Sequence, residues 1–292
     1  MKHPFKNNIP IPPVNLGRIS YINVAPVYYG LDNGLKPDWL NIVSAPPSIL
    51  NNMMAKNELD ISPVSSVAYA KNQDEWLLLP NLSIACFGRV MSVILVSKKP
   101  FEKLTDNKVI ITDKSAAAAE LLKLLFSIKK VKPVFETMPI QCPDEIKKSA
   151  DAALIIGDKA LKEKWELHFD HVFDLGQMWL ELTDLPFVFA LWAVRKSFAD
   201  KKPDTVSSII KLFDISKEQG KKNLEDIANK ASEILGIDID ICKKYYGLLN
   251  YNLDPLQLKG LTSFFEKLYH KEILPQKVQL RFFDSKKSLN LC

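Results

Sequence analysis

The stretch GRVMSVILVSK, residues 88–98, decides the fold. Gly88 favours a turn, and Ser92 is followed by four consecutive apolar residues, mostly β-branched, which is the pattern of a fully buried strand. A second run of this kind, LPFVFALWAV, occupies residues 185–194, and the segment between the two has strand and helix signals of its own. We therefore predict that the two runs cross between two lobes, with the Ser92 hydroxyl facing a cleft.

Before the first crossing, apolar runs alternate with helical patterns. Pro26 and Pro46 suit the first turns of helices, and Ser65 and Ser66 can cap another. Strands are predicted at residues 14–21, 40–44 and 59–64, and helices at residues 27–31, at 46–56 with Ile49, Leu50, Met53 and Met54 facing inward, and from Ser66 onward. This alternating order favours a parallel sheet.

The segment between the crossings repeats the alternation, and the chain after the second crossing has a helical period. Strands are predicted at residues 108–112, 132–137 and 152–156, and helices at 115–128, 144–149, 158–164, 205–220, 224–235, 239–248 and 256–270. The predicted fold is α/β: two mixed sheets flanked by helices and joined by two crossover strands, as in the type 2 periplasmic-binding-protein fold. Residues 14–92 and 195–292 would form lobe 1, residues 93–194 lobe 2, and residues 1–13 a loose arm.

Composition supports a two-lobed globular protein and narrows its partners. A chain of 292 residues, 47% hydrophobic and 25% charged, can build a sizeable core. The net charge of +5 favours an anionic ligand, but no basic stripe interleaved with aromatic residues suggests nucleic-acid binding. The four cysteines lack metal-site spacing, and the sequence shows no signal-peptide pattern and no apolar run of about 20 residues. We expect a cytoplasmic protein that does not bind membranes.

Polar residues that follow strands are the candidates for a site. In open α/β sheets ligands bind outside the carboxyl ends of the strands, where helix N-termini attract anions. Asn23 follows the first strand, Ser65 and Ser66 follow the third, and Thr112 and Ser115 follow the first strand of the second lobe. Asn23 could equally be a helix cap, and a cap is the simpler interpretation for Ser65, Ser66 and Ser115.

The sequence offers no obvious strong base for a reaction. It contains no Ser-His-Asp, HExxH, GxGxxG or GxxxxGK[ST] pattern, and His168, His171 and His270 lie among charged residues away from strand ends, so we expect them at the surface. The site is predicted to consist of amides, hydroxyls and helix ends, with no metal.

Five ordered segments resemble chorismate dehydratase, the first enzyme of the futalosine route to menaquinone. They are GRISYINVAPVYYGL (17–31), ELDISPVSSVAYAKN (58–72), LLPNLSIACFGRVMSVILVSK (78–98), DAALIIGDKAL (151–161) and DLGQMWLELTDLPFVFALWAVR (174–195). The resemblance runs from about residue 16 to about residue 274 in consistent order.

This resemblance implies a cytosolic carbon-oxygen lyase that needs no cofactor and removes water from chorismate, a small dianion, to give 3-[(1-carboxyvinyl)oxy]benzoate. The asparagine of the family's SYLN-type motif falls on Asn23, which we expect to be needed for turnover. The serine of its GPVxS-type motif falls on Ser92, which we expect to bind substrate. Together with the candidates at the strand ends, the expected substrate-binding residues are Ser92, Ser65, Ser66, Thr112 and Ser115. The oligomeric state stays open.

Two positions depart from the family pattern, and two other functions are weighed. Residues 116–119 are all alanine where the family carries hydroxyls, and Arg89 replaces a common proline. The Arg89 side chain would point to solvent or add a cation near the cleft.

The sibling 1,4-dihydroxy-6-naphthoate synthase shares the fold but resembles the chain less closely. A cytosolic, non-catalytic binder of a small carboxylate is the second alternative, in keeping with the alanine run.

Overall fold

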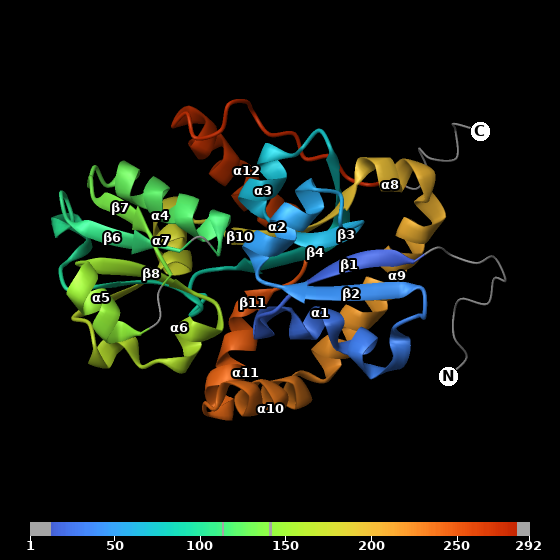
Figure 1. Ribbon diagram of the computed structural model, residues 1–292, viewed down its shortest axis with the longest axis horizontal. Coiled ribbons are helices and arrows are strands. Elements are labelled where there is room, and N and C mark those ends of the chain that lie inside the picture. The colour runs from blue at the N-terminus through green and yellow to red at the C-terminus, as the bar shows by residue number, and fades with distance from the viewer. Residues whose placement is uncertain (1–12, 113, 140–141, 285–292) are drawn as a thin grey trace.

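The computed structural model, which describes residues 13–112, 114–139 and 142–284, has two lobes, each built on one β-sheet (Figure 1). Within these residues the sheet of lobe 1 has six strands in the order β11-β4-β10-β3-β1-β2, and the sheet of lobe 2 has five in the order β7-β6-β8-β5-β9. The strands of lobe 1 are β1 (Val14–Ile19), β2 (Leu40–Ala45), β3 (Ile61–Ser65), β4 (Trp76–Cys86), β10 (Phe187–Arg195) and β11 (Leu249–Asn250). Those of lobe 2 are β5 (Val93–Ser97), β6 (Lys108–Ile111), β7 (Val134–Thr137), β8 (Ala152–Ile156) and β9 (His171–Asp174).

Both sheets are mixed, as predicted. In lobe 1, β1 pairs in parallel with β2 and β3, whereas β10 runs antiparallel to β3 and β4. In lobe 2, β6 pairs in parallel with β7 and β8, and β5 runs antiparallel to β8 and β9. The parallel strands are linked through helices, and their carboxyl ends in both lobes therefore lie at one edge of each sheet.

The two predicted crossover strands do not themselves span the lobes. All the pairing partners of β5 lie in lobe 2, and those of β10 lie in lobe 1, so the chain changes lobes in the short segments 87–92 and 184–186. Residues 187–194 accordingly belong to the first sheet, whereas the predicted boundary placed them in lobe 2. The β-branched, apolar character of both strands reflects burial within one sheet, which sequence alone does not distinguish from a crossing.

Helices cover the sheets largely where the pattern predicted them. They are α1 (Ala25–Gly30), α2 (Pro47–Ala55), α3 (Ser66–Lys71), α4 (Ala116–Ile128), α5 (Pro143–Ser149), α6 (Asp158–Lys162), α7 (Leu175–Thr183), α8 (Lys196–Lys201), α9 (Pro203–Lys222), α10 (Leu224–Leu235), α11 (Ile239–Leu248) and α12 (Pro255–His270). On α2, Leu50 and Met54 are buried, but Ile49 is 48% exposed and does not face inward as predicted. The exposure of Ile49 narrows the buried face of α2.

Two elements of lobe 2, β9 and α7, were not predicted. Strand β9 has only four residues, all half-buried, so its hydrophobic pattern is weak. The helix α7 begins at an N-cap, because the Asp174 carboxylate accepts hydrogen bonds from the Gly176 and Gln177 amides. These two elements complete lobe 2 next to the segment 87–92, in which the chain first passes from lobe 1 to lobe 2.

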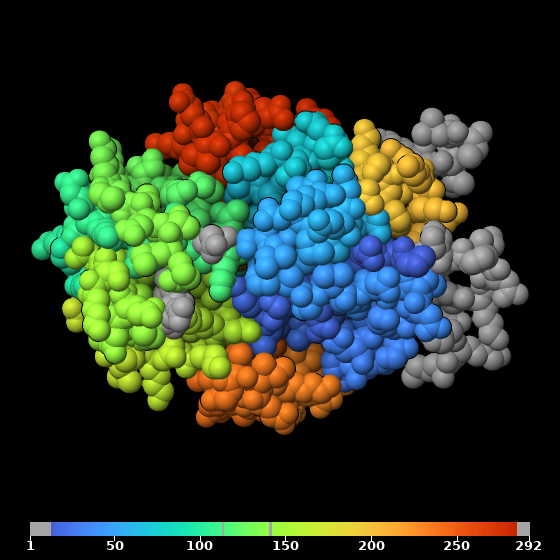
Figure 2. Space-filling model, in the orientation of Figure 1, coloured from blue at the N-terminus to red at the C-terminus, as the bar shows by residue number. Residues whose placement is uncertain are grey.

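The C-terminal helices belong to lobe 1 but reach the junction with lobe 2. Figure 2 shows α10 and α11, in orange, at the lower edge of the molecule where the blue and green lobes meet. Their buried side chains form one hydrophobic cluster with Ile22 of lobe 1 and Leu161 of lobe 2. This cluster ties the two lobes together.

Some sequence predictions concern residues at the edge of the description. The predicted arm lies outside the described residues except for Pro13. Cys86 and Cys242 are buried, Cys142 is exposed, and these three are not in disulfides, while Cys292 lies outside the description. In the part of the chain that the structure describes, no helix has the length and apolarity needed to span a bilayer.

Candidate functional site

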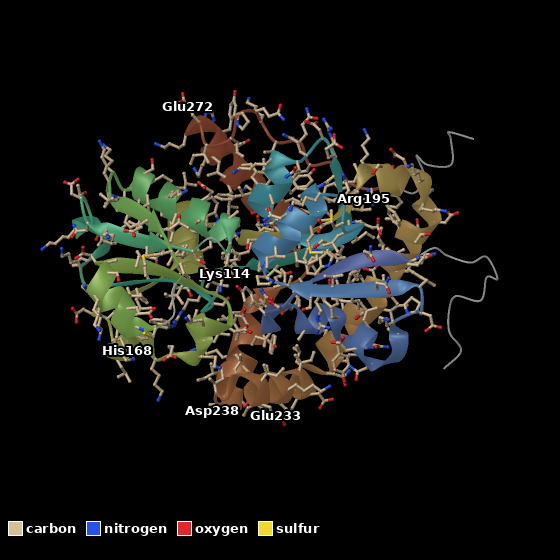
Figure 3. The ribbon with its side chains drawn as sticks, in the orientation of Figure 1. Lys114, His168, Arg195, Glu233, Asp238 and Glu272 are labelled. Carbon is tan, nitrogen blue, oxygen red and sulfur yellow. The ribbon has the colours of Figure 1, made fainter. Side chains whose placement is uncertain are left out.

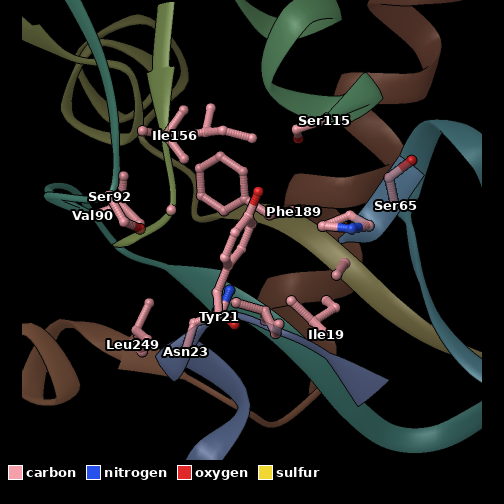
Figure 4. Close-up of a pocket in the computed structure, with 15 residues that line it drawn as sticks. Ile19, Tyr21, Asn23, Ser65, Val90, Ser92, Ser115, Ile156, Phe189 and Leu249 are labelled. Carbon is pink, nitrogen blue, oxygen red and sulfur yellow. The ribbon is translucent and has the colours of Figure 1, made fainter. Parts of the chain in front are cut away.

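A cavity lies where the carboxyl ends of strands from both lobes meet (Figure 4). The empty space in it, including its opening to solvent, is about 550 Å³. Its polar and small lining residues are Tyr21, Asn23, Pro47, Ser65, Ser92, Ser115, Gly157 and Ala190, and its apolar ones are Ile19, Ile84, Val90, Val93, Ile156, Phe189 and Leu249. In the view of Figure 4, Ser92 and Ser65 lie on opposite sides, with Tyr21 between them. Four of the predicted site residues therefore share one cavity: Asn23, Ser65, Ser92 and Ser115.

Asn23 reaches the cavity from a 3-10 turn, Ile22–Val24, directly after β1. Its backbone carbonyl accepts a hydrogen bond from the Tyr251 hydroxyl at 2.9 Å. Its side-chain oxygen, Oδ1, is buried and has no hydrogen-bond partner among the described residues. A buried amide oxygen without a partner is costly, so this atom is placed to receive a donor from a bound molecule.

Ser92 stands at the end of the first crossing and is only 5% exposed. The preceding turn includes Met91 at φ +60° and is held by Asp174, whose carboxylate accepts the amides of Val90 and Met91. The Ser92 Oγ accepts a hydrogen bond from the Tyr245 hydroxyl at 3.0 Å. Its own hydroxyl hydrogen is therefore available to an acceptor in the cavity.

The neighbouring serines at the start of α3 have different positions. Ser65 lines the cavity and is the N-cap of α3, because its Oγ accepts the Ala68 amide at 3.0 Å. Its backbone amide donates to Asn51 Oδ1 at 3.1 Å. Ser66 is fully buried, does not line the cavity, and has no partner for its Oγ among the described residues. Ser66 therefore lies in the core beside the cavity, and its role in substrate binding stays a prediction.

Ser115 lies at the N-terminus of α4, on the lobe 2 side of the cavity. Its Oγ accepts the Ala118 amide at 3.4 Å, so it caps the helix as predicted. The alanine run that follows is structural for the most part, since Ala117, Ala118 and Ala119 are buried in the core. The N-terminus of this helix carries partial positive charge toward the cavity.

Thr112 does not line the central cavity, and its predicted role in substrate binding stays a prediction. It lines a neighbouring pocket with Lys114 and Lys159, and that pocket shares Tyr21 and Ile156 with the central cavity. The Thr112 Oγ1 accepts a hydrogen bond from the Lys114 amide at 3.1 Å. Burial lowers the pKa of Lys159, and the charge of Lys114 lowers it further. Figure 3 shows Lys114 at the junction of the lobes and His168 on the outer side of lobe 2.

The lobes touch beside Asn23 through the segment that follows β8. Gly157 has φ +66°, and a Cβ there would lie 2.9 Å from the Tyr21 ring. The next residue, Asp158, accepts the Ile22 amide through Oδ1 at 3.1 Å. Burial raises the pKa of the Asp158 carboxyl to about 6. The position of Asn23 thus depends on groups from both lobes.

Three residues that matter for the geometry were not singled out as site residues from sequence: Tyr21, Asp158 and Tyr245. Tyr21 and Asp158 each follow a strand directly or nearly so, and the strand-end rule could have found them. Tyr245 is 153 residues from its partner Ser92 and carries no local signal. Arg89 is exposed, which agrees with the solvent-facing position among the two weighed for it.

The cavity can bind a small anion but supplies few groups for proton transfer. Among the described residues that line it, none is a histidine, aspartate, glutamate or lysine. The described residues also contain no group of three or more His, Cys, Asp or Glu side chains placed to hold a metal ion. Hydroxyls, an amide and a helix N-terminus can hold carboxylates and orient a ring between apolar walls.

Comparison with known sequences indicates a single protein family. The profile of a family described as menaquinone biosynthesis matches residues 14–270. A chorismate dehydratase from Thermus thermophilus is 31% identical over 271 residues, which cover 88% of this chain and 95% of that protein. A chorismate dehydratase from Campylobacter jejuni is 29% identical over 283 residues, covering 94% and 98% respectively.

Comparison with solved structures supports the predicted fold. A protein from Archaeoglobus fulgidus superimposes with a TM-score of 0.75 at 19% identity, covering 89% of this chain and 98% of that one. The periplasmic aliphatic sulphonate binding protein of Escherichia coli superimposes with a TM-score of 0.65 at 12% identity, covering 94% and 98%. At such low identities these similarities concern the fold alone, which is that of the periplasmic binding proteins.

Proposed function

Because this chain belongs to the menaquinone biosynthesis family, we propose that it is a chorismate dehydratase of the futalosine pathway. The reaction would convert chorismate to 3-[(1-carboxyvinyl)oxy]benzoate and water, which makes the enzyme a carbon-oxygen lyase. The observation that carries the proposal is a cavity that unites Asn23 and Ser92, the two residues expected to contact chorismate.

The cavity suits a dianion with a ring. Ser92 offers a hydroxyl donor on one side, and Ser65 and Ser115 mark helix starts on others. Ile84, Phe189 and other apolar residues form walls against which a six-membered ring can pack. In this arrangement Ser92 would bind one carboxylate, and the N-terminus of α4 would favour the other through its partial positive charge.

The dehydration breaks a ring C–H bond and the C–O bond to the ring hydroxyl, and the ring becomes aromatic. A proton must leave carbon, and the departing hydroxide must gain one. The described cavity lining holds no carboxylate, imidazole or amine to do this. We assign both proton transfers to the substrate's own enolpyruvyl carboxylate, which would take the proton from carbon and return it to the hydroxide as water forms.

The protein would contribute positioning and fixed dipoles. The partnerless Oδ1 of Asn23 would accept a hydrogen bond from the ring hydroxyl, and its amide group would donate to charge that develops in the transition state. Asn23 is therefore the residue assigned to the reacting region, and Ser92 the one assigned to binding. A biosynthetic role supports the expected cytoplasmic location, which stays a proposal.

A direct assay tests this function. The purified chain is incubated with chorismate, and formation of an aromatic product is followed by ultraviolet absorbance and identified by mass. Product smaller than chorismate by one water supports the proposal. Chorismate binding without product supports a non-catalytic binder instead, and the absence of both favours the sibling 1,4-dihydroxy-6-naphthoate synthase.

A further inference from the structure

Three tyrosines of the C-terminal segment donate hydrogen bonds to Ser92, Asn23 and Ile22, the residue before Asn23. The Tyr245 hydroxyl donates to Ser92 Oγ at 3.0 Å, and the Tyr246 hydroxyl donates to the Ile22 carbonyl at 3.0 Å. The Tyr251 hydroxyl donates to the Asn23 carbonyl at 2.9 Å. We call Tyr245, Tyr246 and Tyr251 the tyrosine clamp. It joins α11 and the residue that follows β11 to both assigned residues, which lie far away in the sequence.

The clamp is well placed to act as a set of donors. Tyr245 and Tyr246 are 1% and 3% exposed, and they pack in the cluster that contains Ile22 and Leu161. Burial raises the pKa of all three hydroxyls, so each keeps its proton at neutral pH. Rigid, protonated donors fix the orientation of the groups that accept from them.

Each hydrogen bond leaves the functional group of its partner available to a ligand. Ser92 Oγ accepts from Tyr245 and retains its own hydrogen to donate. Asn23 is held through its backbone by Tyr251, while its side-chain Oδ1 has no partner among the described residues. The clamp therefore holds both residues without occupying the atoms that would meet a substrate.

We infer that Tyr245 and Tyr251 are positioning residues for the dehydration: Tyr245 aims the Ser92 hydroxyl at a substrate carboxylate, and Tyr251 holds Asn23 at the reacting region. This inference rests on the proposed function. It divides the two roles, since Tyr245 acts on substrate binding and Tyr251 acts on the chemical step.

Isosteric substitutions separate these roles. Tyr245→Phe removes one neutral hydrogen bond, so KM should rise about two- to tenfold with kcat unchanged. Tyr251→Phe should lower kcat by a similar factor with little change in KM. The control is Tyr69→Phe, which removes a buried hydroxyl that donates to the Gln279 carbonyl and does not line the cavity. It should change neither constant.

Double mutants distinguish positioning from packing. In a Ser92→Ala background, Tyr245→Phe should leave KM unchanged, because the group that it orients is absent. In an Asn23→Ala background, Tyr251→Phe should cause no further loss of kcat. Equal fold changes in the parent and substituted backgrounds would overturn the inference. The two pairs are independent, so either one tests the clamp if a variant of the other fails to fold.

The results of these experiments distinguish a failure of the clamp inference from a failure of the proposed function. Failure of the wild type to convert chorismate refutes the function, whereas equal fold changes in a converting enzyme refute the clamp alone. If the wild type binds chorismate without turnover, the Tyr245 and Ser92 cycle is read on the Kd of chorismate by calorimetry. Coupling between the two substitutions supports positioning, and additivity contradicts it.

Discussion

The Asp158 carboxylate of lobe 2 accepts a hydrogen bond from the Ile22 amide of lobe 1, with Oδ1 3.1 Å from the nitrogen. The Ile22 carbonyl accepts a hydrogen bond from the Tyr246 hydroxyl. The peptide groups that flank Ile22 are therefore held by lobe 2 and by α11, and Asn23 follows immediately. Because one of these contacts crosses the cleft, the geometry of the site depends on how the lobes meet.

Asp158 should make stability depend on pH between about 4 and 6. Burial raises the pKa of its carboxyl to about 6 in the folded protein, compared with about 3.9 for an unfolded chain. The folded state binds the proton on Asp158 more tightly than the unfolded chain does. The stabilisation that results is full below pH 4 and is lost as pH rises through 6. Asp158→Asn keeps an acceptor for Ile22 without the buried charge. It should raise the free energy of unfolding at pH 7.5 by about 1 to 3 kcal/mol.

Urea unfolding at pH 4.5 and pH 7.5 measures this effect. The difference between wild type and Asp158→Asn should be small at the lower pH and large at the higher. Asp38→Asn, at an exposed position, is the control and should leave the pH dependence intact. An Asp158→Asn variant less stable than wild type at pH 7.5 would show that the charged form of the carboxylate holds the lobes together.

Gly157 should be required for the close approach of the lobes. It has φ +66° and ψ −149°, a region open essentially only to glycine, and a Cβ would meet the Tyr21 ring. Gly157→Ala should destabilise the protein by about 1 to 3 kcal/mol and weaken chorismate binding, since Tyr21 lines the cavity. Gly236 is the control: it also has positive φ (+67°), but in the left-handed helical region with ψ +36°, and the space around its Cβ position is open.

Thermal unfolding and chorismate titration check the glycine pair together. Gly236→Ala should lower stability by about 1 kcal/mol through the backbone alone and leave binding unchanged. If both variants bind chorismate like the wild type, contact between Gly157 and Tyr21 has no role in forming the site.

Ser92 should contribute to binding more than to chemistry. A hydrogen bond to a charged carboxylate contributes about 1.5 to 3 kcal/mol, so Ser92→Ala should raise KM at least about tenfold. Ser97 ends the same strand, β5, and its hydroxyl donates to the Lys99 carbonyl away from the cavity. Steady-state kinetics of Ser97→Ala should match the wild type. A fall in kcat at unchanged KM for Ser92→Ala would move Ser92 from binding to the chemical step.

Local patterns were sufficient for most of the fold, because each lobe alternates apolar runs with helical ones. The sequence could not reveal that β5 and β10 lie each within one sheet, since burial on both faces gives the same apolar run in a sheet or in a crossing. The strand β9 was not predicted, because its four residues are all half-buried and show no alternation of buried and exposed positions. Its pairing with β5 depends on tertiary contacts.

The rule that ligands meet strand ends located Asn23, Ser65, Ser92 and Ser115 in one cavity. The rule does not specify side-chain direction. It therefore could not show that Ser66 is buried in the core or that Thr112 lines the neighbouring pocket. The partners that hold the site are beyond local inference. Asn23 and Tyr251 are 228 positions apart in the sequence, and only folding brings them together.

The most direct test of this account is the kcat of Asn23→Ala with chorismate, measured beside wild type and Asn33→Ala, an exposed control. Loss of one preorganised hydrogen-bonding group should lower kcat about 10²- to 10³-fold, while the thermal unfolding midpoint stays close to that of the wild type. Asn33→Ala should retain full activity. A correctly folded Asn23→Ala enzyme that turns over chorismate at nearly the wild-type rate would contradict the assignment of Asn23 to the reacting region.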